Sequence, residues 1–190
     1  LERHPAAGPI EWHVMERADD VYVELAQITA IKEVTISNIT SSSATICWVS
    51  EGTPSGVTAD NTVSYGVNST NELTAKDMRP SDVHYVVLIN LQPETTYQFA
   101  VTSGNFTDSN IYPLKTTKPV QPGNNHILFG KVLEADGTTP AADIAVLVRV
   151  KNFHLLSALT DDGGNWDVNL ADLKDPQTGQ GGSFAVGDPI

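Results

Sequence analysis

The chain has 190 residues, of which 40% are hydrophobic and 18% are charged, a composition typical of one or two folded domains and not of a disordered chain. Its 11 basic and 23 acidic residues give a formal net charge of −12, which repels a phosphate backbone and argues against nucleic-acid binding. The single cysteine, Cys47, excludes an intrachain disulfide and therefore a small disulfide-stapled scaffold. No run of about 18 apolar residues exists, so the sequence predicts no membrane span.

Residues 1–29 form an N-terminal extended segment with strand character at residues 9–14 and 21–25. This segment belongs to neither of the two motif sets that follow it. Two interpretations stay open. It is either a strand donated to the open sheet edge of a neighbouring subunit, or part of a longer chain, which is the simpler interpretation.

Residues 30–118 carry short alternating runs separated by clusters of Ser, Thr, Gly, Pro and Asn, the pattern of an antiparallel β-sandwich. The alternation places Ala44, Ile46 and Trp48 on one face, so Trp48 is expected in the core. The number and spacing of the runs favour seven strands. Six such runs are visible, at residues 34–36, 44–49, 62–65, 83–89, 96–102 and 111–116.

Two motifs in this region, SATICW at residues 43–48 and LQPETTY at residues 91–97, resemble the second-strand and tyrosine-corner signatures of fibronectin type III domains. The resemblance implies that Leu91 plugs the end of the sandwich and that Pro93 fixes the turn. It also implies that the hydroxyl of Tyr97 returns to nearby backbone. The expected fold is therefore an immunoglobulin-like sandwich.

Residues 119–125 contain two prolines and one glycine without apolar periodicity, which predicts a short linker. Residues 126–190 then show strand-like alternation at residues 127–133, 144–150 and 166–170. The chain is thus expected to be all-β, with two β-sandwich domains in tandem.

The motifs GKV at residues 130–132, DG at residues 136–137 and TDDGGNW at residues 160–166 resemble the carboxypeptidase-regulatory-like module. That module has a transthyretin-like fold related to the B repeats of collagen adhesins, and the resemblance makes Trp166 a structural residue. The family continues into one more long strand, so the second sandwich is expected to be incomplete, with its C-terminal strand missing. An incomplete sandwich exposes a sheet edge that another chain can cover.

The acidic turn that contains Asp161, Asp162, Asn165 and Asp167 is a candidate calcium site, because its side chains offer the oxygen ligands that calcium prefers. It lacks the register and the distal Glu of an EF-hand, and the dihedral angles of a hairpin turn explain the same residues better. No other cofactor is expected. The five histidines are scattered without zinc-ligand spacing.

No catalytic site is expected from the sequence. Cys47 lies next to Trp48 within a predicted strand and has no activating histidine nearby in the sequence. Lys131 resembles the lysine that forms isopeptide bonds in collagen-adhesin repeats, yet no partner is identifiable. Asn38, Asn68 and Asn105 each begin an Asn-x-Thr sequence, which permits N-linked glycosylation in a glycosylating secretory pathway.

The sequence therefore predicts a non-catalytic structural or adhesive module of a secreted or cell-surface protein, which acts as a spacer, stalk or interaction scaffold. Its partners would be neighbouring domains of the same protein or other surface proteins. One alternative is a set of accessory domains of a larger secreted hydrolase. Another is a self-assembling filament or surface-layer subunit that exchanges β-strands through an open sheet edge.

Overall fold

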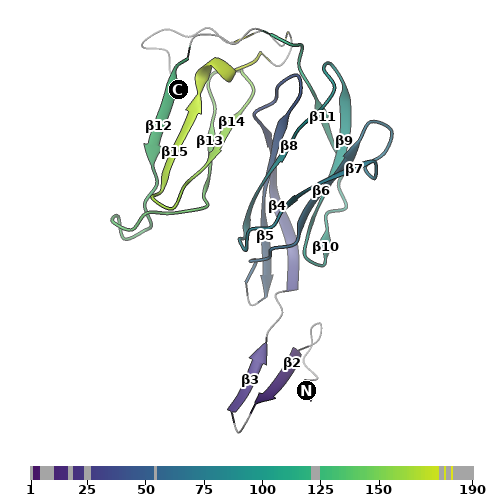
Figure 1. Cartoon of the computed structure of the whole chain (residues 1–190), viewed down its shortest axis with the longest axis vertical. Coiled ribbons are helices and arrows are strands. Elements are labelled where there is room, and N and C mark those ends of the chain that lie inside the picture. Colours follow the sequence, from purple (N-terminus) through teal and green to yellow (C-terminus); the bar gives the residue numbers. More distant parts are fainter. Residues whose placement is uncertain are drawn as a thin grey trace.

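The computed structural model of the chain is built almost entirely of antiparallel β-strands, which confirms the all-β prediction (Figure 1). It describes residues 2–4, 11–16, 19–23, 27–53, 55–120, 125–175, 178 and 181. Within these residues the one helical element is a short 3-10 turn, Leu170–Asp172.

The first sandwich consists of two sheets that face each other. One sheet has the order β4-β5-β8, and the other has the order β10-β9-β6-β7, with β11 also paired to β9. The strands of the first sheet are β4 (Gln27–Ser37), β5 (Ala44–Thr53) and β8 (Val83–Leu88). Those of the second are β6 (Asn61–Gly66), β7 (Leu73–Asp77), β9 (Thr96–Ser103), β10 (Phe106–Thr107) and β11 (Tyr112–Lys115).

Alternating apolar residues of both sheets form the core of the first sandwich, as the period of two in the sequence requires. Trp48 and Phe99 are the largest side chains that are fully buried in it. Trp48 lies opposite His84 in the register of β5 with β8, and its indole Nε1 donates to Ser103 Oγ at 2.7 Å. Since Ser103 belongs to β9, this bond joins the two sheets through the core.

The second sandwich has a separate, smaller core between two short two-stranded sheets. One sheet pairs β12 (Ile127–Lys131) with β15 (Asn165–Asn169), and the other pairs β13 (Ala145–Val148) with β14 (Leu156–Leu159). Trp166 lies opposite Gly130, and a Cβ atom at Gly130 would come within 2.8 Å of the indole ring. The glycine therefore leaves the space that the ring occupies.

The N-terminal strands β1 (Glu2–His4), β2 (Glu11–Glu16) and β3 (Asp19–Val23) form a sheet of their own, in the order β1-β2-β3. Among the described strands, they pair with one another and with no strand of either sandwich. Donation of this segment to another chain remains a prediction. Strand β4 begins at Gln27, three residues before the expected start of the first sandwich at residue 30.

Four strands were not expected from the sequence: β1 in the N-terminal segment, and β7, β10 and β14 in the two sandwiches. Strand β7 lies at the end of its sheet with four of its five side chains at least partly exposed, so it has no alternating apolar pattern. Strands β10 and β14 are too short for a period to be visible. Most of the expected linker, residues 121–124, and the expected incomplete end of the second sandwich, residues 182–190, lie outside the described residues.

Candidate functional site: the junction between the two sandwiches

Strand β5 is buried on both faces, although the first sandwich covers only one of them. Ala44, Ile46 and Trp48 face the core of the first sandwich. Thr45 and Cys47 lie on the opposite face and are nevertheless only 2% and 4% exposed. The second sandwich covers this outer face with strands β13 and β14, which lie beside β8 in Figure 1. The junction between the sandwiches is therefore a packed interface.

Asn38, directly after β4, joins the first sandwich to β14 of the second. Its side-chain Oδ1 accepts the backbone N–H of Ser157 at 2.9 Å, and its Nδ2 lies 3.0 Å from the Ser157 carbonyl oxygen. Its own backbone N–H donates to the Leu155 carbonyl oxygen at 2.9 Å. Asn38 has a φ of 49°, a left-handed conformation that asparagine tolerates better than most residues. Its side chain thus continues a strand-like ladder onto β14.

Hydroxyl groups surround this contact. The Oγ atoms of Ser37 and Ser157 are 2.7 Å apart, and the Tyr85 hydroxyl lies 3.1 Å from the Ser157 carbonyl oxygen. Nδ2 of Asn38 also lies 3.1 Å from the Tyr85 hydroxyl oxygen, so two amide protons are shared among several acceptors. A buried polar cluster of this kind favours one geometry of the two sandwiches, because a displaced group would lose its partner.

Cys47 lies within this hydroxyl cluster. Burial raises the pKa of its thiol to about 11, and hydrogen bonds with Ser37 and Ser157 only partly oppose that effect. Since the thiolate is the reactive form of cysteine, the Cys47 thiol is both protonated and inaccessible at neutral pH. It therefore acts as a structural side chain here, and it becomes accessible only when the junction opens or the sandwich unfolds.

Arg79 links the sandwiches through charge. Its guanidinium group contacts both carboxylate oxygens of Asp77, and its Nη1 donates to Asp143 Oδ1 of the second sandwich at 2.6 Å. Burial raises the pKa of Asp77, but hydrogen bonds from Arg79 and from the Tyr85 N–H outweigh burial and leave this pKa below its ordinary value. The Asp143 side chain is half exposed, so this pair contributes at most about 1 kcal/mol.

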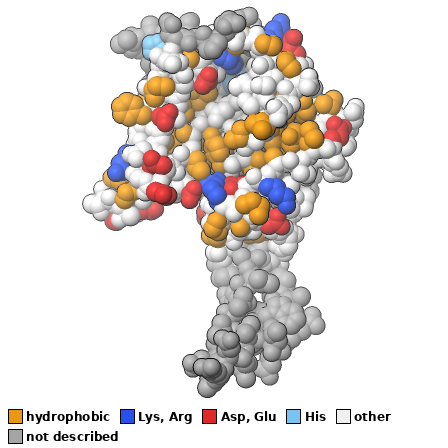
Figure 2. Space-filling view, in the orientation of Figure 1, with side chains coloured by type: hydrophobic (Ala, Val, Ile, Leu, Met, Phe, Trp, Pro, Cys, Tyr) orange, Lys and Arg blue, Asp and Glu red, His pale blue; other side chains and the backbone are white. Residues whose placement is uncertain are grey.

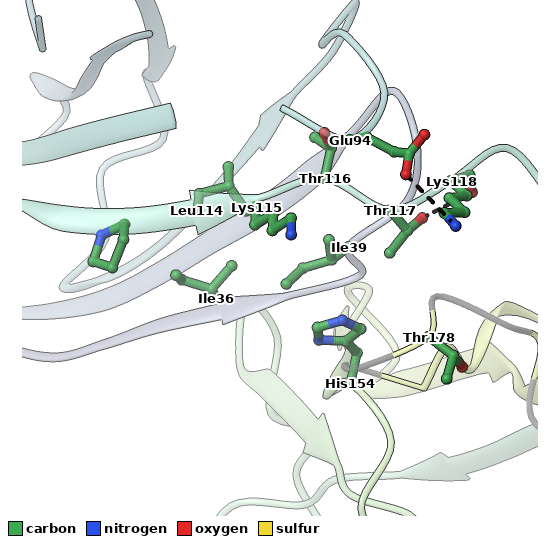
Figure 3. A pocket seen from close by; sticks show the side chains of 11 residues that line it. Ile36, Ile39, Glu94, Leu114, Lys115, Thr116, Thr117, Lys118, His154 and Thr178 are labelled. Carbon is green, nitrogen blue, oxygen red and sulfur yellow. Dashed lines mark hydrogen bonds and ion pairs between the residues drawn. The ribbon is translucent and has the colours of Figure 1, made fainter. Parts of the chain in front are cut away.

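A pocket of about 290 Å³ lies between the two sandwiches (Figure 3). Its walls come from the end of β4, from β11 and from the loop that precedes β14. Burial lowers the pKa of His154 in this pocket, although the nearby charge of Asp175 opposes the change. The lining residues are Ile36, Ile39, Glu94, Pro113, Leu114, Lys115, Thr116, Thr117, Lys118, His154 and Thr178.

The structure places the expected structural residues of the first sandwich at its core and at one corner. Leu91 is buried, and Pro93 is exposed in the turn before β9. The Tyr97 hydroxyl oxygen accepts the backbone N–H of Gln92 at 2.8 Å. This contact ties the start of β9 to the turn that precedes it. Trp166 packs against the core of the second sandwich.

The acidic turn does not gather its side chains around one point. Asp161 Oδ1 accepts the backbone N–H groups of Gly163 and Asn165, each at 2.8 Å, and these bonds close a tight turn. The turn is not the expected hairpin turn, because the strands that it connects, β14 and β15, pair in different sheets. The bonds from Asn165 are the main cause of the lowered pKa of Asp161. Asp162 and Asp167 are exposed. Across the described part of the chain, no group of three His, Cys, Asp or Glu side chains is arranged to hold a metal ion.

The structure also shows a serine–histidine contact that the sequence did not suggest. Ser50 Oγ lies 2.6 Å from His84 Nε2 and donates to the Gly56 carbonyl oxygen at 2.6 Å. Because the single hydroxyl proton goes to Gly56, Nε2 of His84 must be the donor to Ser50. Both side chains are buried, so the hydroxyl is neither free nor accessible as a nucleophile. His84 alternates with Val86 and Leu88 in one run of the sequence, and this pattern could have indicated that the His84 side chain is buried.

No helix in the part of the chain that the structure describes is long and apolar enough to cross a membrane.

No protein-family model matches this sequence, and no curated protein is significantly similar to it. Three solved structures of the sensor domain of the anti-sigma factor RsgI4 from Pseudobacteroides cellulosolvens overlap part of the chain. The first is 24% identical and is covered over 99% of its length by 51% of this chain, with a TM-score of 0.35. A longer form is 24% identical, and the match covers 97% of its length and 53% of this chain, with a TM-score of 0.35. A solution structure is 23% identical, and the match covers 76% of its length and 50% of this chain, with a TM-score of 0.33. Overlaps this small support no conclusion about function.

Proposed function

We propose that this chain is a non-catalytic structural or interaction module of a secreted or cell-surface protein, in which the two sandwiches form one rigid spacer. The observation that carries the proposal is the junction. The outer face of β5 is buried by the second sandwich, and the Asn38 side chain pairs with the backbone of Ser157.

The junction favours rigidity because its hydrogen bonds are directional. Inter-domain interfaces within a chain usually allow relative motion unless something fixes them. Here the backbone N–H groups of Asn38 and Ser157 are both used across the junction. Each bond contributes about 1 kcal/mol, and leaving a buried partner unpaired costs about 1–3 kcal/mol. Separation of the sandwiches would therefore leave several groups unpaired at once.

Several features support a fibronectin type III-like first domain and a carboxypeptidase-regulatory-like second domain. The strand order β4-β5-β8 opposite β10-β9-β6-β7 and the contact of Tyr97 with Gln92 support the first. The close approach of Trp166 to Gly130 and the Asp161 turn support the second. Modules of these types serve as stalks, spacers or supports for adhesion, which is consistent with a place outside the cell.

The visible face of the first sandwich offers an apolar surface to a partner. Figure 2 shows hydrophobic side chains gathered on that face, and basic side chains are few and scattered there. Exposed large apolar residues of this sandwich include Leu73, Val87 and Ile89. Such a surface favours contact with other proteins over contact with an anionic polymer.

A second candidate, self-assembly by strand exchange, is favoured by one observation. Strand β12 pairs only with β15 among the described strands, and its outer residues Ile127 and Phe129 are 53% and 77% exposed. An open edge with apolar side chains can accept another strand. Light scattering across a wide concentration range tests this candidate. A chain that stays monomeric throughout is not a filament subunit, and a role beside a secreted hydrolase would then be the remaining alternative.

The rate at which Cys47 reacts with iodoacetamide at pH 8 tests the rigid junction directly. In Asn38→Gly the side-chain contacts with Ser157 are lost while the left-handed backbone at this position stays unstrained. We expect alkylation at least about tenfold faster than in the unmodified chain, since one lost buried hydrogen-bond pair corresponds to roughly 1.4 kcal/mol.

Asn90→Gly is the matched control, because Asn90 also has a positive φ, 58°, and is exposed in the turn after β8. Small-angle scattering on both variants reports whether the two sandwiches remain at one separation. Equal alkylation rates and equal scattering for the two variants would refute the rigid junction.

A further inference from the structure

The pocket between the sandwiches combines a hydrophobic floor with cationic groups. Ile36 and Ile39 form the floor, and the Lys115 side chain extends toward them in Figure 3, whereas Leu114 lines the pocket from β11 and directs its side chain into the core of the first sandwich. The Glu94–Lys118 ion pair, with a separation of 3.8 Å, marks one rim. His154 closes the opposite side, and it comes from the second sandwich.

The charge of this pocket is opposite to that of the chain. The chain has 23 acidic and 11 basic residues, yet among the described residues that line the pocket the fully charged ones are Lys115, Lys118 and Glu94. The charge of Asp175 acts on His154 from outside this lining. Lys118 forms an ion pair with Glu94, whereas Lys115 forms no ion pair with another described residue. Screening in physiological salt acts over about 8 Å, so these local charges govern what enters the pocket.

The floor favours one kind of ligand body. Aliphatic side chains and Pro113 line it, and the described residues of the lining include no tyrosine, tryptophan or phenylalanine on which a sugar ring could stack. The hydroxyl of Thr116 is already used, because it donates to the Gln92 carbonyl oxygen at 2.6 Å and accepts the Thr95 N–H at 2.9 Å. A hydrocarbon body with one anionic end fits these walls better than a polyol.

We propose that this pocket binds a small organic carboxylate, with its carboxylate at Lys115 and Lys118 and its hydrocarbon part against Ile36 and Ile39. This binding goes beyond the spacer role. Because Lys115 and His154 line the same pocket from different sandwiches, a molecule that fills the pocket stabilises the closed junction. Opening of the junction and occupancy of the pocket are then thermodynamically linked.

The probe for the test is hexanoate, with hexanol and hexylamine as the neutral and cationic molecules of the same length. Titration of the full chain is followed by the NMR signals of the His154 imidazole and by the alkylation rate of Cys47. We expect hexanoate to bind with a millimolar dissociation constant, to raise the pKa of His154 and to slow the alkylation of Cys47. Hexanol and hexylamine should bind more weakly.

The matched variants are Lys115→Met in the pocket and Lys76→Met on β7. Lys76 is also an exposed lysine, and it pairs with Asp60 at 3.7 Å outside the pocket. Lys115→Met should weaken hexanoate binding about fivefold, the factor expected for an exposed ionic contact, and Lys76→Met should leave it unchanged.

Three results would overturn the proposal: no saturable shift of the His154 signals with hexanoate, equal affinity for hexanol, or equal weakening by the two lysine substitutions. The rigid junction is tested separately by Asn38→Gly without any added molecule. A failure of hexanoate binding is therefore distinguishable from a failure of the spacer role.

Discussion

The Asn38 side-chain amide pairs with both backbone groups of Ser157, a residue 119 positions later in the chain, at 2.9 Å and 3.0 Å. This arrangement reproduces the hydrogen bonding between two strands, with a side chain in place of one backbone. It makes the junction of the two sandwiches specific, since another side chain at position 38 would offer either the donor or the acceptor but rarely both.

Asn38 is also the first residue of a glycosylation pattern, as are Asn68 and Asn105. A glycan would be attached to Nδ2, the atom that donates across the junction, and the folded junction has no room for it. Expression in a glycosylating secretory pathway should therefore give glycans at Asn68 and Asn105, which are exposed, and little or none at Asn38. Glycopeptide mass spectrometry measures the occupancy of each position. Full occupancy at Asn38 together with a protected Cys47 would contradict this account.

The buried His84 makes the stability of the first sandwich dependent on pH. Burial lowers the pKa of His84 from 6.5 to about 4, while the charge of Asp77 opposes this change only in part. Below pH 6.5 the unfolded chain binds a proton that the folded chain does not bind until about pH 4. Stability should thus be fully present above pH 6.5 and should fall by up to roughly 3 kcal/mol toward pH 4.

Urea denaturation at a series of pH values measures this change in the free energy of unfolding. Amide hydrogen exchange in β8 and β9 reports the same change locally. His84→Gln should lower stability overall and remove most of the dependence in this range. His154 is half buried with a lowered pKa and contributes in the same direction, so His154→Gln separates the two histidines. A flat profile in the unmodified chain would show that His84 is protonated without cost.

Tyr97→Phe removes the hydroxyl that accepts the Gln92 N–H and changes nothing in the buried ring. The expected loss of unfolding free energy is about 1–2 kcal/mol, the usual effect of leaving one backbone donor without its partner. Urea denaturation measures it, and amide exchange at Gln92 should accelerate in the same variant. Unchanged exchange at Gln92 would mean that the turn does not depend on this bond.

Gly130→Ala tests the packing of the second sandwich. The added methyl group would lie 2.8–2.9 Å from three atoms of the Trp166 indole, so the ring must move. We expect a loss of about 1–3 kcal/mol and a shift of the Trp166 fluorescence, because overpacking forces neighbouring side chains out of position. Gly181→Ala is the control, since no atom of the described residues lies within 4 Å of a Cβ atom there. Equal stability of the two variants would show that the second core adapts freely.

Much of the first sandwich could be predicted because its strands alternate between core and surface. Trp48, Phe99 and Val101 stand at inward positions, and the structure buries all three. The junction could not be predicted in the same way. Ser37, Thr45 and Tyr85 occupy outward positions of their strands, where polar residues ordinarily meet water. Nothing in their local pattern distinguishes a solvated face from a face that another sandwich covers.

The sequence by itself determined that the chain is all-β, which residues of β5 and β9 point into the first core, and that the acidic segment at Asp161 forms a turn. These features depend on side-chain periodicity and on local turn geometry, both of which are determined by residues close together in the sequence. Only the tertiary structure decided that Cys47 is buried on an outer face, that Asn38 and Ser157 meet, and that Lys115 and His154 share one pocket. Such contacts arise from the docking of two sandwiches, a relationship between distant segments that no local pattern encodes.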